Sequence, residues 1–252
     1  MNPIRIIGAC CKFGQKRSGV EFAPYLVEKE LNINMQKVGD KEFNDEICFD
    51  YDKLYDLHGH ELKSNKVLTI GGDHSISYST ISSALDKYKD SLHVIWIDAH
   101  TDINTQSTSH SGNLHGMPVG HLLKYETHPY ATFNSNKLDT SQLTYIGIRD
   151  LDKPEIERVI SSNIARNTRD LKRISKNSNI MLSIDVDALD PSEFPCTGTP
   201  VKNGLKLNDI LKIIDEFKQR TVAIDIVEFN PLIGVNNSRY CTKQIKKLID
   251  SL

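Results

Sequence analysis

Short apolar runs alternate along the chain with segments of helical spacing, and this alternation constrains the fold more than any other feature. The runs are rich in Ile and Val, and each ends at Gly, Asp or Glu. They cover residues 4–8, 67–71, 94–98, 143–147, 180–185 and 222–228. Runs of this kind are typical of strands buried on both faces of a parallel sheet. We therefore expect an α/β protein with a mostly parallel central sheet covered by helices.

Segments with helical spacing lie between these runs, and no repeat, low-complexity stretch or Pro/Gly/Ser linker divides the chain. The expected helices cover residues 24–31, 77–88, 154–164, 207–217 and 242–252. We expect residues 1–252 to form one domain. In open α/β sheets, ligands bind beyond the carboxyl ends of the strands. The polar residues that close the apolar runs therefore mark the place where a functional site is expected.

The charge balance of this 252-residue chain argues against several classes of partner. The 31 Lys and Arg residues nearly balance the 33 Asp and Glu residues, so the formal net charge of -2 does not favour nucleic acid or an anionic membrane. The 5 cysteines include no C-x-x-C pattern and give no disulfide framework. The apolar stretch at residues 4–11 is too short for a secretory signal or a membrane span. We expect a cytoplasmic protein with no nucleic-acid or membrane partner.

Acidic residues and histidines close three of the expected strands. Asp98, His100 and Asp102 occupy alternate positions after one run. Asp185 and Asp187 do so after another. Side chains at alternate positions of an extended backbone point to the same side. A third run ends in two glycines, which would allow a sharp turn that brings the next histidine inward. The candidate metal ligands are His74, Asp98, His100, Asp102, Asp185 and Asp187.

This ligand set indicates a pair of metal ions. Four carboxylates so close together could not all stay ionised without a compensating cation. Oxygen-rich ligation with one imidazole per ion suits Mn²⁺, and the ligand types leave Fe²⁺, Co²⁺ and Zn²⁺ open. Two ions about 3.5–4 Å apart would hold a bridging water and lower its pKa from about 15.7 toward ~7, which is metal-assisted hydrolysis. The alternative, for each acidic pair taken alone, is a helix cap or a turn.

Four longer motifs resemble those of the ureohydrolases, and within them those of the arginases. They are residues 71–75 (GGDHS), 98–104 (DAHTDIN), 111–118 (SGNLHGMP) and 183–191 (SIDVDALDP). The resemblance runs from residues 19–21 (GVE) to residues 228–231 (EFNP). It implies a three-layer α/β/α sandwich and two Mn²⁺ ions per chain, held by the same six residues that the strand ends indicate.

The resemblance further implies how the reacting end of a substrate would be held. Glu228 matches the family's acidic residue that binds the guanidinium, and Thr199 matches the residue near the same end. His115 matches the proton shuttle, a task that suits an imidazole near neutral pH. Asp102 would orient the attacking hydroxide. The alternatives are a cap or a surface ion pair for Glu228, a simple turn at Thr199 and a structural role for His115.

The resemblance also includes residues that would bind the amino-acid end of the substrate, namely a polar loop and an acidic pair. The loop residues that resemble α-carboxylate contacts are Asn104, Ser109, Ser111 and Asn113. Asp152 and Glu155 resemble the pair that engages the α-amino group. A loop rich in Ser and Asn is otherwise an ordinary loop, and acidic residues around a Pro are common at a helix N-terminus.

Taken together, the resemblance implies hydrolysis of L-arginine to L-ornithine and urea by a metal-bridging hydroxide. The alternatives are another ureohydrolase acting on agmatine, a different guanidino compound or formiminoglutamate, and a metal-binding homologue without activity. Agmatine lacks the carboxylate that the loop would bind, so the loop favours arginine. The family also implies a trimer or hexamer, although this chain is short between Asp152 and Asp185 and after Asn237, where the family makes subunit contacts.

Overall fold

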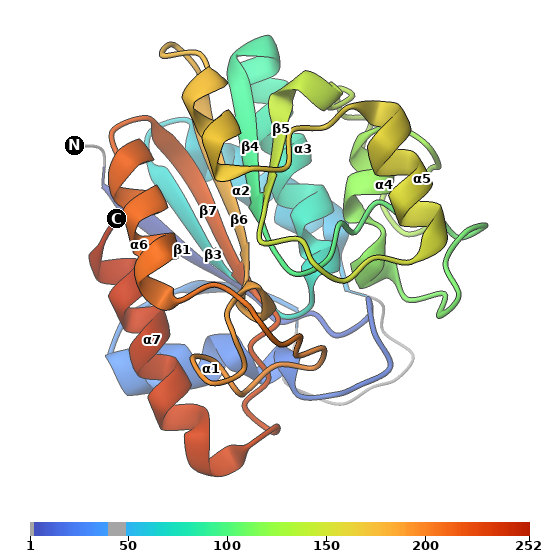
Figure 1. Ribbon diagram of the computed structural model, residues 1–252. Coiled ribbons are helices and arrows are strands. Elements are labelled where there is room, and N and C mark those ends of the chain that lie inside the picture. The colour runs from blue at the N-terminus through green and yellow to red at the C-terminus, as the bar shows by residue number, and fades with distance from the viewer. Residues whose placement is uncertain (1–2, 40–48) are drawn as a thin grey trace.

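The protein is built on a seven-stranded sheet in which every pair of neighbouring strands is parallel (Figure 1). The computed structural model describes residues 3–39 and 49–252. The strands are β1 (Ile4–Ala9), β2 (Gln36–Val38), β3 (Lys66–Ile70), β4 (Leu92–Ile97), β5 (Leu143–Ile146), β6 (Asn179–Asp185) and β7 (Thr221–Val227). Their order across the sheet is β2-β1-β3-β7-β6-β4-β5. The expected α/β fold with a parallel sheet is confirmed.

Helices cover both faces of the sheet, which gives the expected three layers. They are α1 (Ala23–Leu31), α2 (Tyr51–Leu62), α3 (Ser77–Tyr88), α4 (Pro118–Leu122), α5 (Lys153–Ser162), α6 (Leu207–Phe217) and α7 (Ser238–Asp250). One apolar core joins the sheet to α2, α3, α4 and α5, and a second joins it to α1, α6 and α7. Figure 1 shows α6 and α7 on the side opposite α3 and α4. None of the helices in the described ranges is long and apolar enough to cross a bilayer.

The register of the central strands brings four strand ends to one level. Ile97 pairs with Ile184, and Asp185 pairs with Val227. On the far side of β7, Ile70 of β3 pairs with Ile226. The residues that follow β3, β7, β6 and β4 therefore leave the sheet side by side, at its carboxyl edge. This is where the sequence places the acidic residues and histidines.

The two glycines after β3 lie where the chain bends and where other segments approach closely. Both have φ outside the left-handed region. A Cβ on Gly72 would lie 1.8 Å from the backbone oxygen of Cys11, which accepts from the backbone N–H of Asp73 at 3.0 Å. A Cβ on Gly71 would meet Val227 at 2.7 Å. The chain bends at Gly72 and Asp73, just before the buried His74. Glycine is also needed here because the β1 and β3 loops touch, a reason that the sequence does not reveal.

Replacing Gly72 with Ala is expected to destabilise the fold by about 3 kcal/mol, because backbone would have to move to admit the methyl group. Gly59→Ala in α2 is the matched control, since its Cβ would meet only Ser83 at an ordinary 3.5 Å. In a helix that change should be stabilising by up to about 1 kcal/mol. Thermal unfolding of both variants checks the prediction. Equal melting temperatures would contradict the close approach of the two loops.

Candidate metal centre and substrate pocket

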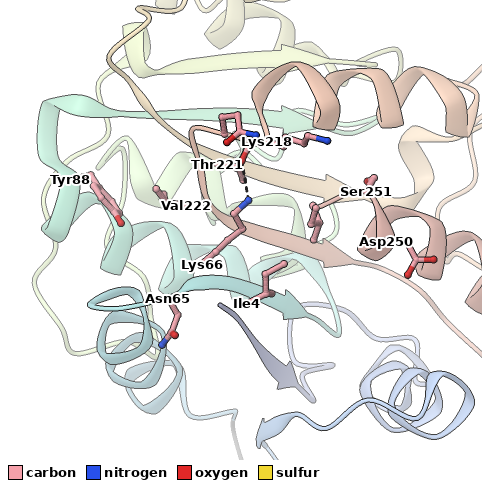
Figure 2. Close-up of a pocket in the computed structure, with 11 residues that line it drawn as sticks. Ile4, Asn65, Lys66, Tyr88, Lys218, Thr221, Val222, Asp250 and Ser251 are labelled. Carbon is pink, nitrogen blue, oxygen red and sulfur yellow. Dashed lines mark hydrogen bonds between the residues drawn. The ribbon is translucent and has the colours of Figure 1, made fainter. Parts of the chain in front are cut away.

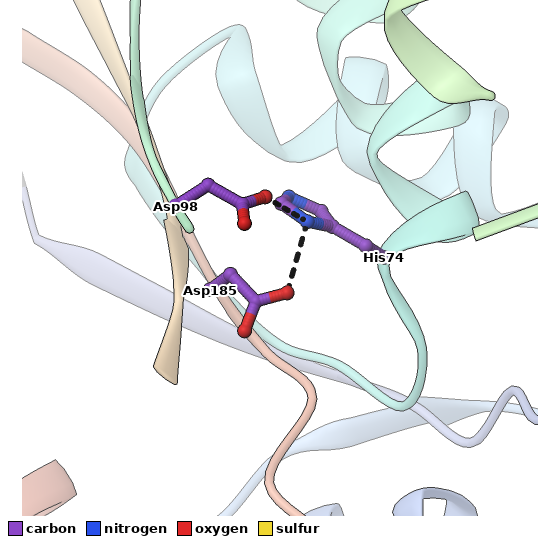
Figure 3. A group of neighbouring side chains, drawn as sticks. All are labelled: His74, Asp98 and Asp185. Atoms are coloured by element: carbon purple, nitrogen blue, oxygen red, sulfur yellow. Dashed lines mark ion pairs between the residues drawn. The ribbon is translucent and has the colours of Figure 1, made fainter. Parts of the chain in front are cut away.

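His74 faces a group of carboxylates at the carboxyl edge of the sheet (Figure 3). Its Nδ1 lies 3.1 Å from Asp98 Oδ2, 3.1 Å from Asp102 Oδ2 and 3.3 Å from Asp185 Oδ2. This nitrogen is buried and makes no hydrogen bond of acceptable geometry. The ligand atoms of His74, Asp98 and Asp185 all lie within 4.8 Å of one another, and Asp102 adjoins them through His74. Such proximity is what a cation requires of its ligands.

A second group adjoins the first and shares a residue with it. His100 Nδ1 lies 3.1 Å from Asp187 Oδ2 and 3.5 Å from Asp98 Oδ1. His74, Asp98 and Asp185 form one triad that could hold a metal ion, and Asp98, His100 and Asp187 form the other. Asp98 thus offers one oxygen to each triad. The six residues expected from the sequence lie together, in an arrangement that fits two neighbouring divalent cations.

Neighbouring side chains hold this ligand set in place. His74 Nε2 lies 2.8 Å from the hydroxyl of Ser183, and the His74 ring stacks on Trp96 with ring centroids 4.1 Å apart. Trp96 Nε1 donates to Asp98 Oδ2 at 2.9 Å. Partners of this kind orient a metal-binding imidazole or carboxylate. Buried residues of β4 and β6 therefore orient the ligands His74 and Asp98.

The pKa values of these groups show an excess of negative charge. Burial, together with the nearby Asp98, raises the pKa of Asp102 to about 7. Burial and the neighbouring Asp187 raise the pKa of Asp185 well above its ordinary value. Burial alone would lower the pKa of His100, but Asp187 and Asp98 outweigh it and raise that pKa to about 12. A divalent cation would remove the repulsion that these shifts reflect, so the chemistry of the site also fits bound metal.

Two residues of the site have a left-handed backbone although neither is glycine. Asp102 has φ 48° and Glu228 has φ 65°. Such conformations cost about 1–3 kcal/mol each and persist where the surrounding structure enforces them. The backbone oxygen of Asp102 accepts from Val119 and Gly120 in α4, and the backbone N–H of Glu228 donates to Gly72. These hydrogen bonds hold both residues in an unfavourable backbone conformation, which orients their carboxylates.

A cavity of about 210 Å³ opens beside the two triads. The residues expected from the sequence that line it are His100, Asp102, Asn104, Ser109, Ser111, His115, Asp152, Glu155 and Thr199. The remaining four candidate metal ligands are buried. Asn113 and Glu228 are not among the lining residues. The cavity therefore joins the metal-side residues to most of the expected substrate contacts.

Glu228 lies behind His115 and is 1% exposed. Its Oε1 accepts from the backbone N–H of His74 at 2.9 Å and lies 3.0 Å from His115 Nδ1. Burial would lower the pKa of His115, but the Glu228 carboxylate outweighs it and raises that pKa to about 9. His115 is therefore mostly protonated at neutral pH in this arrangement, and able to act as an acid.

Asp152 and Glu155 have structural roles as well as a place in the cavity. They form a capping box at the start of α5, with Asp152 Oδ1 accepting from the Glu155 backbone N–H at 2.9 Å. Asp152 Oδ2 accepts from Asn104 Nδ2 at 3.0 Å, and Glu155 Oε1 accepts from Thr101 at 2.7 Å. Asp152 and Glu155 therefore do cap the helix, which was the alternative role expected from the sequence. Both residues also line the cavity.

Thr199 is tied to the second triad. Its hydroxyl donates to Asp187 Oδ2 at 2.7 Å. Arg149, which the sequence analysis did not single out, supports the same segment: its guanidinium donates to the backbone oxygens of Asp187 at 2.7 Å and Val201 at 2.8 Å. Gln15 was also missed, and its Nε2 donates to Glu228 Oε2 at 2.7 Å. These contacts join residues far apart in the sequence, so spacing could not reveal them.

A second cavity lies at the opposite, amino edge of the sheet and has a different character (Figure 2). It measures about 440 Å³ and lies between β1, β3 and β7. Lys66 Nζ reaches across to the backbone oxygen of Lys218 at 3.0 Å. Asp250 is the acidic side chain among its lining residues, and no imidazole lines it. This cavity lacks the ligand chemistry of the carboxyl edge.

Comparison with known proteins shows to which family the chain belongs. The model of the arginase family matches residues 2–247. The chain belongs to the arginase family. Arginase of Staphylococcus aureus (strain COL) is 33% identical in an alignment that covers 93% of this chain and 92% of that protein. This chain is therefore an arginase-family hydrolase that acts on guanidino C–N bonds, and the family is metal-dependent.

Solved arginase structures share the fold. Arginase from Bacillus subtilis superposes with a TM-score of 0.86 at 27% identity, covering 100% of this chain and 98% of that one. Entamoeba histolytica arginase in complex with L-ornithine superposes with a TM-score of 0.82 at 28% identity, covering 100% and 98%. Structures described as a putative agmatinase and a formimidoylglutamase, at 21% and 22% identity, share the fold alone.

Proposed function

We propose that this arginase-family chain hydrolyses L-arginine to L-ornithine and urea. The observation that carries the proposal is the composition of the 210 Å³ cavity. Its lining combines the metal-side residues His100 and Asp102 with side chains that carry hydroxyl, amide and carboxylate groups. A substrate with a guanidinium at one end and an α-amino acid at the other matches this combination. The similarity to a solved arginase that binds L-ornithine supports the same substrate class.

We assign the two triads to two Mn²⁺ ions, with Asp102 as the further ligand close to His74. When bound, a pair of divalent ions lowers the pKa of water from about 15.7 toward ~7 and so supplies hydroxide at neutral pH. Asp102 is placed to orient that nucleophile, because its carboxylate both adjoins the first triad and lines the cavity. Residues 1–252 would act as one unit, since the ligands come from the ends of three strands, β3, β4 and β6.

The substrate's two ends are assigned to different residues. We assign the guanidinium to Glu228, whose buried carboxylate lies 3.0 Å from the cavity-lining His115, with Thr199 near the same end. The α-carboxylate is bound by the polar loop of Asn104, Ser109, Ser111 and Asn113. Asp152 and Glu155 face the α-amino group, to which their charge is complementary. These contacts fix the guanidinium carbon beside the nucleophile.

His115 supplies the proton that the reaction needs. Attack of hydroxide on the guanidinium carbon and cleavage of the C–N bond leave an amine that must be protonated. With Nδ1 facing Glu228, the imidazolium keeps Nε2 to donate a proton toward the cavity that His115 lines. The products are then L-ornithine and urea.

The proposal is tested by comparing L-arginine, agmatine and formiminoglutamate at equal concentrations with Mn²⁺ present. We expect L-arginine to react at least about tenfold faster than agmatine, because agmatine lacks the carboxylate that the loop binds. A preference for agmatine or formiminoglutamate would assign the chain to another ureohydrolase activity. Bound metal without product from any of the three would indicate a homologue without activity.

A further inference from the structure

The orientation of Glu228 depends on a donor outside the proposed catalytic set. Glu228 Oε1 is taken by the His74 backbone and by His115, at 2.9 Å and 3.0 Å. The other oxygen, Oε2, accepts from Gln15 Nε2 at 2.7 Å. A carboxylate that is 1% exposed needs donors on both oxygens, and Gln15 provides the one on Oε2.

The β1–α1 loop holds Gln15 firmly against the site. The backbone N–H of Gly14 donates to Asp73 Oδ2 at 2.8 Å, and the backbone oxygen of Gly14 accepts from His115 at 3.0 Å. The backbone N–H of Gln15 itself donates to Lys12 at 3.1 Å. The loop is therefore attached to the segment after β3 and to the segment that carries His115. Gln15 is positioned by the same contacts that position those residues.

The side chain of Gln15 also lies next to the segment that carries Thr199. Its Oε1 is 3.4 Å from the place that a Cβ on Gly198 would occupy. Two residues further along the loop, Arg17 donates to the backbone oxygen of Gly198 at 2.8 Å. Gln15 thus sits between Glu228 and the Gly198 segment, and it fixes the side of the carboxylate that His115 does not reach.

The amide is a suitable donor because it carries no charge. A Lys or Arg at this place would also donate to Oε2, but it would pair with the carboxylate and compete with a guanidinium. A neutral donor orients the carboxylate and leaves its negative charge for the ligand. We propose that Gln15 is a positioning residue that holds Glu228 ready to bind the guanidinium of the substrate. This inference rests on the proposed role of Glu228 in arginine hydrolysis.

The experiment compares ligands with and without a guanidinium in the Mn²⁺-loaded protein. Gln15→Met keeps the length of the side chain and removes its donor. We expect KM for L-arginine and the dissociation constant of guanidinium ion to rise about tenfold, the effect of one hydrogen bond to a charged group, while kcat changes less. The dissociation constant of L-ornithine should stay unchanged, because ornithine has no guanidinium. Gln15→Lys should weaken guanidinium binding at least as much.

Gln142→Met is the matched control. Gln142 Nε2 also donates hydrogen bonds, to the backbone oxygens of Lys89 and Leu92 at 2.9 Å each, but it lies just before β5 at the amino edge of the sheet. This variant should leave the binding of all three ligands unchanged.

Two results would overturn the inference. Equal weakening of guanidinium and L-ornithine binding in Gln15→Met would mean a general disturbance of the site, and unchanged guanidinium binding would mean that Glu228 needs no orientation by Gln15. Failure of the proposed function gives a different pattern, because wild-type protein would then release no urea from L-arginine. Calorimetric binding of guanidinium and L-ornithine would still decide the role of Gln15 in that case.

Discussion

Asp98→Asn is expected to abolish binding of both metal ions and to lower the rate of arginine hydrolysis by at least about a thousandfold, equivalent to roughly 4 kcal/mol of lost stabilisation. The reason is that Asp98 offers one oxygen to each triad, so its loss affects both metal positions. Metal content by mass spectrometry and urea release, measured on the same sample, check this result.

Asp187→Asn is expected to disrupt only one of the two metal positions. Asp187 belongs only to the triad with Asp98 and His100, so this variant should keep about one ion per chain and still lose activity. Asp225→Asn is the control, because Asp225 is buried but lies outside both triads, where it accepts from Ser77 at 2.9 Å and Thr80 at 2.6 Å. It should keep both ions. Full activity in Asp98→Asn, or equal metal loss in Asp225→Asn, would contradict the assignment of the centre.

Glu228→Gln is expected to have the next largest effect, a fall in kcat/KM for L-arginine of about a thousandfold. The variant keeps the shape of the side chain but removes the buried charge that pairs with the guanidinium, and charge-assisted hydrogen bonds contribute about 1.5–3 kcal/mol each. Steady-state kinetics with L-arginine measure the loss. Metal content should stay unchanged, since Glu228 belongs to neither triad.

The same variant changes the acidity of His115. Burial lowers the pKa of this imidazole, and the facing Glu228 carboxylate raises it to about 9. Without that carboxylate the largest influence that raises the pKa is lost, so the pKa of His115 should fall below 9, although Asp102 and Asp73 still raise it. NMR titration of His115 in the metal-free protein tests this shift. A pKa that stays near 9 in Glu228→Gln would show that another group keeps His115 protonated.

The strands that matter for the site could be predicted from the sequence because they are buried on both faces. β4 and β6 are nearly continuous apolar runs; Asp98 follows β4 directly, and Asp185 is the last residue of β6. β2 was not predicted, since three residues at the edge of the sheet, Gln36–Val38, give no such run. Parallel pairing then brings the strand ends together. For this reason, alternate residues such as Asp98 and His100 could be assigned to one site from the sequence alone.

Other parts of the site depend on contacts that sequence spacing does not encode. Gln15 and Glu228 are 213 positions apart, and only the folded loops bring them within hydrogen-bond distance. Arg149 is likewise defined by the backbone oxygens that it binds, not by its neighbours in the sequence. The glycines after β3 were recognised from the sequence, but the close approach of Cys11 to Gly72 is revealed only by the packing of the two loops. Local patterns predict strand ends, whereas loop-to-loop contacts require the fold.

The assignment of two Mn²⁺ ions is tested most directly by urea and ornithine release from L-arginine by the purified chain, first after chelation and then during titration with Mn²⁺. We expect no release after chelation and a rise in activity that is complete at about two Mn²⁺ ions per chain. Agmatine, assayed in parallel, should give little product. Release from the fully chelated chain, or bound Mn²⁺ without any urea, would contradict the account.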